Sequence, residues 1–186
     1  MKLHIGDPAP DFEVKDIYNK PIRLSDYPGK KILISFYRNV ACPFCNLRVH
    51  QLGKLHPTLQ AQGLEMLFFF ETPKKHILLS SFHSGLSPIS IVGDPEKNTY
   101  KLYGVENSLL KSVATLLKSG AQEQLKEAKA LGLDKFKDDT VMSRVLPADF
   151  LIDEQGIIRE VYYGTAMNDH LPIQQVKDFA ILASAI

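Results

Sequence analysis

Two apolar runs of seven residues dominate the middle of the sequence, and an amphipathic stretch separates them. Residues 31–37 (KILISFY) and 64–70 (LEMLFFF) are almost continuously hydrophobic, a pattern typical of strands covered on both faces of a sheet. Between them, residues 43–60 carry apolar side chains mainly at steps of three to five residues, which predicts an amphipathic helix with a kink at Pro57 and an end at Gly63. A strand, a helix and a strand in this order predict parallel strands joined by a right-handed crossover.

The rest of the chain divides into shorter elements of both kinds. Residues 8–24 alternate apolar and polar side chains around a turn at 19–21, which predicts an antiparallel pair. The further expected elements are a helix at 74–83, a short strand at 89–92, a helix at 96–103 that Asp94 caps and Pro95 begins, a hairpin of 148–153 with 156–163, and a closing helix at 172–182. They predict one α/β domain over residues 1–186, a mixed central sheet flanked by helices. Residues 106–144, rich in Lys and Ala, are expected to form a helical insertion before the last hairpin. For its amphipathic stretch 109–117, packing on the domain's own core is favoured over covering the active-site edge or forming a subunit contact.

Charge and hydropathy exclude several classes of function. The chain has 22 Lys and Arg against 21 Asp and Glu, so no global field favours nucleic acid or a membrane surface, and neither is expected as a partner. No apolar run approaches the roughly 20 residues that span a bilayer, and the first residues lack the apolar core of a signal peptide. We therefore expect a soluble, cytoplasmic protein.

Both cysteines of the chain stand in one motif, Cys42-Pro43-Phe44-Cys45, where the first buried strand meets the helix. A disulfide between them would close almost no chain and would stabilise the fold little, so the pair is typical of a catalytic or metal-binding site. At the predicted N-cap, Cys42 lies near unpaired N–H groups and the positive end of the helix, which stabilise a thiolate, and Pro43 suits the first helical position. Cys45 returns to the same helix face, so we expect Cys42 to attack and Cys45 to resolve the mixed disulfide.

The same cysteine spacing also occurs in zinc sites, and His50 and His56 lie downstream as candidate ligands. A structural zinc site needs a closed set of nitrogen or sulfur ligands, and the sequence has no second cysteine pair. Redox chemistry is therefore the favoured interpretation, with both histidines on the helix surface. We expect no flavin, haem or metal as a cofactor.

Several motifs along the chain are shared with one known family. They are Gly6-Asp7-Pro8-Ala9-Pro10-Asp11-Phe12, Pro21-Ile22-Arg23-Leu24-Ser25-Asp26-Tyr27, Phe36-Tyr37-Arg38 and Asp149-Phe150-Leu151-Ile152-Asp153-Glu154-Gln155-Gly156-Ile157-Ile158. With these motifs the sequence closely resembles the peroxiredoxin-like redoxins of the alkyl hydroperoxide reductase and thiol-specific antioxidant family, nearly from end to end. The resemblance implies a thioredoxin-like fold and a thiol-dependent antioxidant activity.

The active segment departs from the pattern of that family. In peroxiredoxins the active segment resembles Phe-Tyr-Pro, a short variable stretch, a Thr, two more residues and then the peroxidatic Cys. A gapless comparison places that Cys on Cys45. The family's Thr then falls on Cys42 and its Pro on Arg38. The resemblance to peroxiredoxins therefore nominates Cys45 as the attacking thiol, whereas the helix geometry nominates Cys42.

A further departure lies before the last hairpin, where peroxiredoxins place an Arg that helps to stabilise the thiolate. That position holds Pro147, which resembles the cis-proline that thioredoxins and glutaredoxins set opposite their cysteine pair. We therefore predict a cis bond between Leu146 and Pro147. The dipeptide Pro43-Phe44 also resembles that of some glutaredoxins, in which the N-terminal Cys attacks.

Two charged residues near the motif have two interpretations each. Arg38 either stabilises a thiolate, in place of the missing peroxiredoxin Arg, or lies in solvent as a loop residue. Glu71 either shuttles a proton for Cys45 or is a solvated turn residue. Strand directions predict that Glu71 and Pro147 both lie at the cysteine end of the sheet. The remaining candidates are expected to serve packing (Tyr162, Tyr163, His170) or to lie on the surface (His4, His76, His83).

The predicted site residues are Cys42, Cys45, Arg38, Glu71 and Pro147. The leading hypothesis is a thiol-dependent antioxidant enzyme that cycles the cysteine pair between dithiol and disulfide to reduce peroxides or protein disulfides. Its electrons would come from a thiol donor such as thioredoxin or glutathione, and the sequence leaves room for a homodimer. The alternatives are a thioredoxin- or glutaredoxin-like disulfide reductase without significant peroxidase activity, and a non-enzymatic redox-sensing or metal-binding module.

Overall fold

A five-stranded mixed sheet forms the centre of the molecule, in a computed structural model that describes residues 2–108, 115, 120–136 and 143–182. Its strand order is β5-β4-β3-β6-β7. The strands are β3 (Lys31–Tyr37), β4 (Leu64–Phe70), β5 (Ser90–Gly93), β6 (Ala148–Ile152) and β7 (Ile158–Tyr163). β3 is parallel to β4 and antiparallel to β6, so the predicted strand-helix-strand unit and the predicted hairpin are both confirmed.

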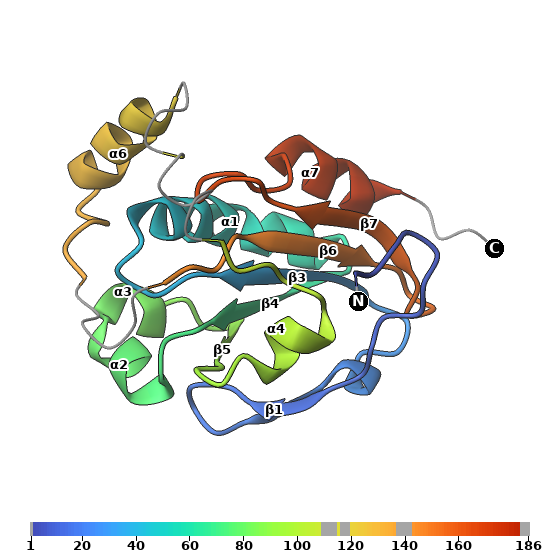
Figure 1. The fold of residues 1–186 in the computed structure, drawn as a ribbon. Helices are drawn as coiled ribbons and strands as arrows, with labels where there is room; N and C mark the ends of the chain where they lie inside the picture. The colour runs from blue at the N-terminus through green and yellow to red at the C-terminus, as the bar shows by residue number, and fades with distance from the viewer. Residues whose placement is uncertain (1, 109–114, 116–119, 137–142, 183–186) are drawn as a thin grey trace.

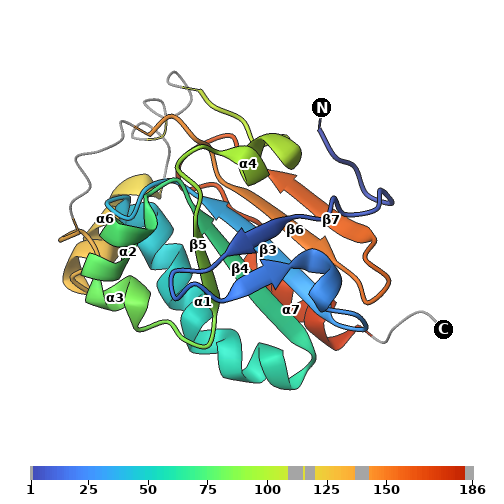
Figure 2. The same cartoon turned by 90° about the horizontal axis from the view of Figure 1, so that it is seen from below.

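Helices and a small sheet cover the two faces of the central sheet (Figures 1 and 2). The helices α1 (Pro43–Ala61) and α7 (Ile173–Ile181) lie over one face, and α4 (Asn98–Leu102) over the other. The same second face carries the predicted antiparallel pair, β1 (Glu13–Lys15) with β2 (Pro21–Arg23), which η1 (Leu24–Asp26) follows. Alternate side chains of each strand build the two cores: Leu33 and Phe68 pack under α1, while Ile34 and Phe69 pack on the opposite side. The mixed α/β architecture expected from the sequence is confirmed.

Two helices differ from the sequence prediction in their extent. The helix expected at 74–83 is divided into α2 (Lys74–Leu79) and α3 (Ser81–Ser84), because Ser80 is extended and its hydroxyl accepts from the backbone N–H of His83. The helix expected at 96–103 begins only at Asn98, because Lys97 takes a left-handed conformation with φ 59°. Asp94 still caps α4 by accepting hydrogen bonds from its first two backbone N–H groups, those of Asn98 and Thr99.

The predicted insertion contributes the helix α6 (Ala121–Ala130). α6 packs beside the first half of α1, where Ala128 and Leu133 meet Leu47 in a small hydrophobic cluster. The amphipathic stretch 109–117 lies outside the described residues apart from Thr115, which is buried. Among the helices of the described residues, none has both the length and the apolar character that crossing a bilayer requires.

Candidate active site

The cysteine pair lies where the chain leaves the C-terminal end of β3 and enters α1. Cys42 is the N-cap of that helix and Pro43 occupies its first position, as the sequence predicts. Both thiols are free; Cys42 is 6 % exposed, whereas Cys45 is completely buried. A substrate approaching this end of the helix therefore meets Cys42 first. In the described part of the chain, no three His, Cys, Asp or Glu side chains gather as a metal site would require.

The two thiols have opposite pKa shifts. A hydrogen bond from the Cys45 thiol is the largest cause that lowers the pKa of Cys42 to about 7, against the opposing effect of burial. The charge of Arg38, the backbone N–H of Cys45 and a hydrogen bond from Arg38 lower it further. Burial raises the pKa of Cys45 well above its usual range, and the hydrogen bond and charge of Cys42 add to that rise. At pH 7, about half of Cys42 is thus thiolate, whereas Cys45 is protonated.

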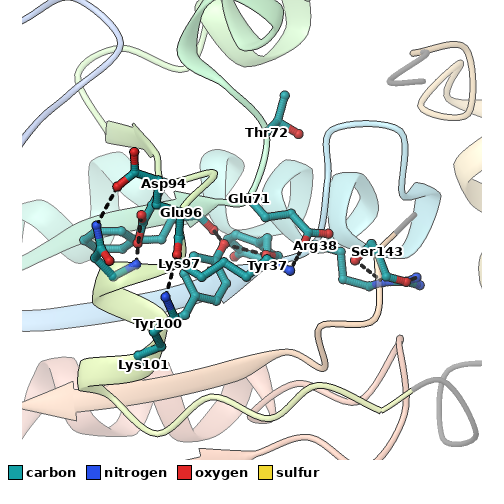
Figure 3. Close-up of polar contacts among 12 residues, drawn as sticks. Tyr37, Arg38, Glu71, Thr72, Asp94, Glu96, Lys97, Tyr100, Lys101 and Ser143 are labelled. Atoms are coloured by element: carbon teal, nitrogen blue, oxygen red, sulfur yellow. Dashed lines mark hydrogen bonds and ion pairs between the residues drawn. The ribbon is translucent and has the colours of Figure 1, made fainter. Parts of the chain in front are cut away.

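Arg38 hydrogen-bonds Cys42 and is held by contacts from distant parts of the chain, among them Ser143 (Figure 3). Its Nε donates a 3.0 Å hydrogen bond to Ser143 Oγ, and its Nη2 donates one of 2.7 Å to the carbonyl oxygen of Ser143. Its Nη1 contacts Met167 Sδ. Of the two interpretations of Arg38, the structure therefore favours the position that stabilises a thiolate over a solvated loop position.

Glu71 lies at the cysteine end of the sheet, one residue beyond the pair Tyr37–Phe70, as the strand directions predict. Its side chain is completely buried, so the interpretation as a solvated turn residue is wrong. Glu71 Oε2 lies 2.8 Å from Lys97 Nζ (Figure 3). This ion pair compensates the buried carboxylate and explains why Lys97 is held outside the helix that it was expected to join.

Pro147 also lies at this end of the sheet, next to Ala148, which pairs with Phe36. The Leu146–Pro147 bond is trans, and the cis X-Pro bond within the described residues is Ser87–Pro88, so the cis prediction is wrong. The backbone around Pro147 is extended and paired on both sides: Leu146 N donates to Glu106 O, and Pro147 O accepts from Gly164 N. A trans bond continues this pairing into β6, so the resemblance to a thioredoxin cis-proline does not extend to the backbone.

Buried polar side chains fix the loop that carries the thiols. Thr72 Oγ1 accepts from Val40 N at 3.0 Å, and Asn46 Nδ2 donates to Val40 O at 2.9 Å. Asn46 Oδ1 lies 3.0 Å from His83 Nε2, and Ser80 Oγ lies 2.7 Å from His83 Nδ1. Burial lowers the pKa of His83 to about 3, so its imidazole is neutral. The expectation that His83 lies on the surface is wrong, as it is for His56, which is also buried.

A buried charge network lies behind the thiol loop, and the sequence reasoning missed it. Asp149 on β6 accepts hydrogen bonds from Ser35 Oγ at 2.6 Å and Leu171 N at 2.9 Å, and its Oδ2 lies 3.1 Å from His170 Nδ1. Burial acts to raise the pKa of Asp149, but the charge and hydrogen bond of His170, with the charge of Arg48, lower it to about 2. His170 also packs against the ring of Tyr37, with 5.3 Å between centroids. An Asp and a Ser in otherwise apolar strands were the features from which this network could have been found.

Comparisons with known proteins agree with this site. A family model described as the AhpC/TSA family matches residues 5–161, and the chain therefore belongs to that family. The chain is 24 % identical to a thiol-disulfide oxidoreductase ResA of Geobacillus thermodenitrificans, over 90 % of its length and 74 % of the relative. It is 26 % identical to a Haemophilus influenzae protein that carries the name peroxiredoxin bcp, over 90 % of the chain and 91 % of the relative. The solved structure of a 2-Cys peroxiredoxin of Plasmodium vivax matches with a TM-score of 0.65 and 18 % identity, over 95 % of this chain and 80 % of that one.

Family membership and the cysteine pair together define the class of protein. The expected resemblance to the alkyl hydroperoxide reductase and thiol-specific antioxidant family is confirmed, and so is the thioredoxin-like fold. The chain is a thiol-dependent oxidoreductase whose Cys42 and Cys45 fit a redox-active pair. Its reaction takes a thiol, disulfide or peroxide substrate and a reductant.

Proposed function

We propose that this enzyme reduces disulfide bonds through a dithiol mechanism in which Cys42 attacks and Cys45 resolves. The observation that carries the proposal is the opposite shift of the two thiol pKa values, with Cys42 lowered to about 7 and Cys45 raised. A thiolate is the attacking species in disulfide exchange, and the more exposed of two thiols is the one that a protein disulfide reaches. The relatives named as thiol-disulfide oxidoreductases support the same reaction.

The proposed steps balance without a cofactor. The Cys42 thiolate attacks one sulfur of the substrate disulfide and the S–S bond of the substrate breaks. A mixed disulfide forms, and the first substrate sulfur leaves as a thiolate that takes a proton from solvent. Cys45 loses its proton and attacks Cys42 Sγ, which releases the second substrate thiol and leaves a disulfide between Cys42 and Cys45. The substrate gains two electrons that the protein dithiol loses, and a thiol donor such as thioredoxin or glutathione restores the dithiol.

Reduction of peroxides is the second candidate, favoured by the family and by the position of Arg38. An Arg beside a thiolate polarises a peroxide, as expected from a guanidinium charge. Attack of the thiolate on peroxide oxygen would give a sulfenic acid and water or an alcohol, and the second thiol would displace water to form the disulfide. Both candidate reactions oxidise the cysteine pair to the same Cys42–Cys45 disulfide, and they differ in whether a disulfide or a peroxide is the oxidant.

A substrate assay separates these candidates. Steady-state rates are measured with insulin disulfide, hydrogen peroxide and an alkyl hydroperoxide, each with thioredoxin and with glutathione as the donor. We expect turnover of insulin disulfide; turnover of the peroxides alone would overturn the proposal in favour of the second candidate. Turnover of none of them, with a metal bound to the purified reduced protein, would favour the non-enzymatic alternative.

Arg38→Met is expected to raise the pKa of Cys42 from about 7 toward the ordinary range near 8.5, because the thiolate loses its neighbouring positive charge. At pH 7 the thiolate fraction would then fall below about one half, while the hydrogen bond from Cys45 still lowers the pKa. The measurement is the rate of Cys42 alkylation by iodoacetamide as a function of pH. Arg159→Met removes a positive charge from the other end of β7 and should leave the profile unchanged; an unchanged profile in Arg38→Met would contradict the role of Arg38.

We propose that Glu71 exchanges the proton of Cys45 during resolution. The position of Glu71 supports this role, because it is buried at the cysteine end of the sheet. Glu71→Gln should slow release of the mixed disulfide by about tenfold or more, while alkylation of Cys42 stays nearly unchanged. Rapid-quench analysis of a single turnover measures the two steps separately. The exposed Glu96→Gln is the matched control, and equal release rates in both variants would refute the role.

We propose a cytoplasmic location and no binding to nucleic acid or membranes, on the charge balance of the sequence and the use of both cysteines in the redox pair. Cell fractionation tests the location; recovery with the envelope would contradict it.

A homodimer is proposed as well, and sedimentation of the reduced and oxidised protein measures it. A monomer in both states would exclude it at the concentrations used.

A further inference from the structure

A small polar cavity lies against the first turns of α1, beside the cysteine pair. Its volume is about 140 Å³, and Phe44, the residue between the cysteines, forms part of its wall. The polar side chains of its lining are Arg48, Gln51, Gln124, Asn168 and His170. None of the lining residues is acidic.

Two of these side chains are buried and lack part of their hydrogen bonding within the described residues. Arg48 is 7 % exposed and donates from Nη2 to Leu171 O at 2.6 Å, but its Nε has no partner there. His170, whose side chain is 6 % exposed, has Nδ1 at Asp149, while its Nε2 has no partner. A buried cation without a carboxylate contact is costly, and an anionic ligand would compensate it.

Asp149 does not supply that contact. Its carboxylate is taken up by Ser35 Oγ, His170 Nδ1 and Leu171 N, and within the described residues it forms no ion pair with Arg48. Asp149 therefore orients His170 from behind, with Nδ1 toward the carboxylate and Nε2 left for another group. The guanidinium and the second imidazole nitrogen are the groups that remain for a ligand.

The cavity and the thiols share their supporting segments. Phe44 and Arg48 are one helical turn apart on α1, and Phe44 lies between the two cysteines. On the other side, Met167 contacts Arg38, the guanidinium that stabilises Cys42, and the neighbouring Asn168 lines the cavity. Phe44 is thus the residue that the cysteine motif and the cavity wall have in common.

We propose that this cavity binds the carboxylate of a small thiol or disulfide substrate, so that the enzyme accepts carboxylate-bearing low-molecular-weight disulfides at Cys42. The volume of about 140 Å³ is well below the roughly 300–1,000 Å³ of pockets for drug-sized ligands, which suits a carboxylate with a few carbon atoms. Arg48 supplies the charge-assisted hydrogen bonds and Gln51 supplies an amide, whereas Asn168 Nδ2 already donates to Gln124 Oε1 at 2.9 Å. This inference rests on the proposed dithiol mechanism and names the substrate class of the same site.

The binding test uses the reduced full chain labelled with ¹⁵N and observes the Nε–H resonance of Arg48. Propionate is the probe, and propionamide is its neutral counterpart. We expect a saturable shift with propionate and none with propionamide. An equal shift with sodium chloride at the same ionic strength, an equal shift with propionamide, or no shift would overturn the carboxylate site.

The kinetic test compares 3,3′-dithiodipropionate with its diamide in single turnovers of the dithiol protein. We expect the diacid to have a KM at least about tenfold lower, with similar maximal rates, because charge-assisted hydrogen bonds add to its binding. Arg48→Gln should abolish the difference, and Gln51→Leu, at a half-buried position of the cavity, should reduce it if Arg48→Gln does not fold. Lys54→Gln removes one exposed charge from the same helix outside the cavity and should retain the difference.

The two tests distinguish failure of the cavity from failure of the proposed function. Equal KM values for diacid and diamide, with no shift at Arg48, would refute the cavity while disulfide reduction stands. A propionate shift at Arg48 in a protein that reduces neither compound would refute the dithiol function and retain only a carboxylate site.

Discussion

Replacement of Cys45 by serine is expected to trap a stable mixed disulfide on Cys42, whereas replacement of Cys42 by serine should abolish disulfide reduction. The reason is that the two thiols differ in pKa and exposure. Cys42 has its pKa lowered to about 7 and is partly exposed to solvent, whereas Cys45 is buried and protonated. Without Cys45 no thiol displaces the substrate from Cys42, and without Cys42 no thiolate reaches the substrate. Mass spectrometry of each variant after a disulfide substrate measures the adduct directly.

A peroxide arm of the same experiment tests the opposite assignment that the peroxiredoxin pattern suggests. That pattern nominates Cys45 as the residue that peroxide oxidises. The raised pKa and complete burial of Cys45 argue that Cys42→Ser should form sulfenic acid slowly, at a rate far below that of the wild type. Rapid formation of a sulfenic acid on Cys45 in Cys42→Ser would show that the family assignment of roles is right and ours is wrong.

The central strand-helix-strand unit could be predicted from the sequence because its determinants are local. The runs 31–37 and 64–70 match β3 and β4 residue for residue, and the helix between them ends within one residue of its predicted limit. Continuous apolar strands and a helix with a clear glycine stop leave few alternatives. Strand direction then placed Glu71 and Pro147 at the cysteine end of the sheet without any knowledge of tertiary contacts.

The boundaries that the sequence did not predict depend on contacts between distant residues. Asp94 and Pro95 form a sound local start signal, but Lys97 leaves the helical conformation where it pairs with Glu71, which is 26 residues earlier in the chain. In the preceding predicted helix, at 74–83, Ser80 is extended and separates α2 from α3. Its hydroxyl hydrogen-bonds His83, and the ring of His83 contacts Asn46 on α1. Tertiary interactions of this kind override local propensity and leave no periodic trace in the sequence.

The candidate site shows the same division. The cysteine motif and its N-cap position follow from spacing, but the contact of Arg38 with Ser143 joins residues 105 positions apart. The sequence predicts a packing role for His170, as for the strand aromatics near it, and its partner Asp149 becomes visible only when β6 is aligned with the loop after β7. The prediction for Pro147 failed for a different reason: a resemblance of position was extended to a peptide-bond geometry that the neighbouring backbone pairing does not require.

Asp149→Asn is expected to lower the free energy of unfolding by about 3 kcal/mol, although Asp149 is not in direct contact with the substrate position. The neutral amide turns N–H groups toward donors from which the carboxylate accepted hydrogen bonds, and the substitution removes the charge that orients His170. Urea unfolding measures the change, which should appear as a lower midpoint with an unchanged m value. Asp178→Asn on the exposed face of α7 is the matched control, with an expected change within about 0.5 kcal/mol.

The pH dependence of that difference tests whether the charge of Asp149, rather than its shape, is responsible. The pKa of Asp149 in the fold is about 2, below the unfolded value near 3.9, so the ionised carboxylate stabilises the fold fully above about pH 4 and this contribution is lost as the pH falls toward 2. The stability gap between wild type and Asp149→Asn should therefore narrow over that window. His83, with a pKa of about 3 in the fold, makes both proteins less stable as the pH falls from about 6.5, and this effect cancels in the difference. A gap that stays constant down to pH 2.5 would show that the hydrogen bonds of Asp149, and not its charge, hold the loop behind the thiols.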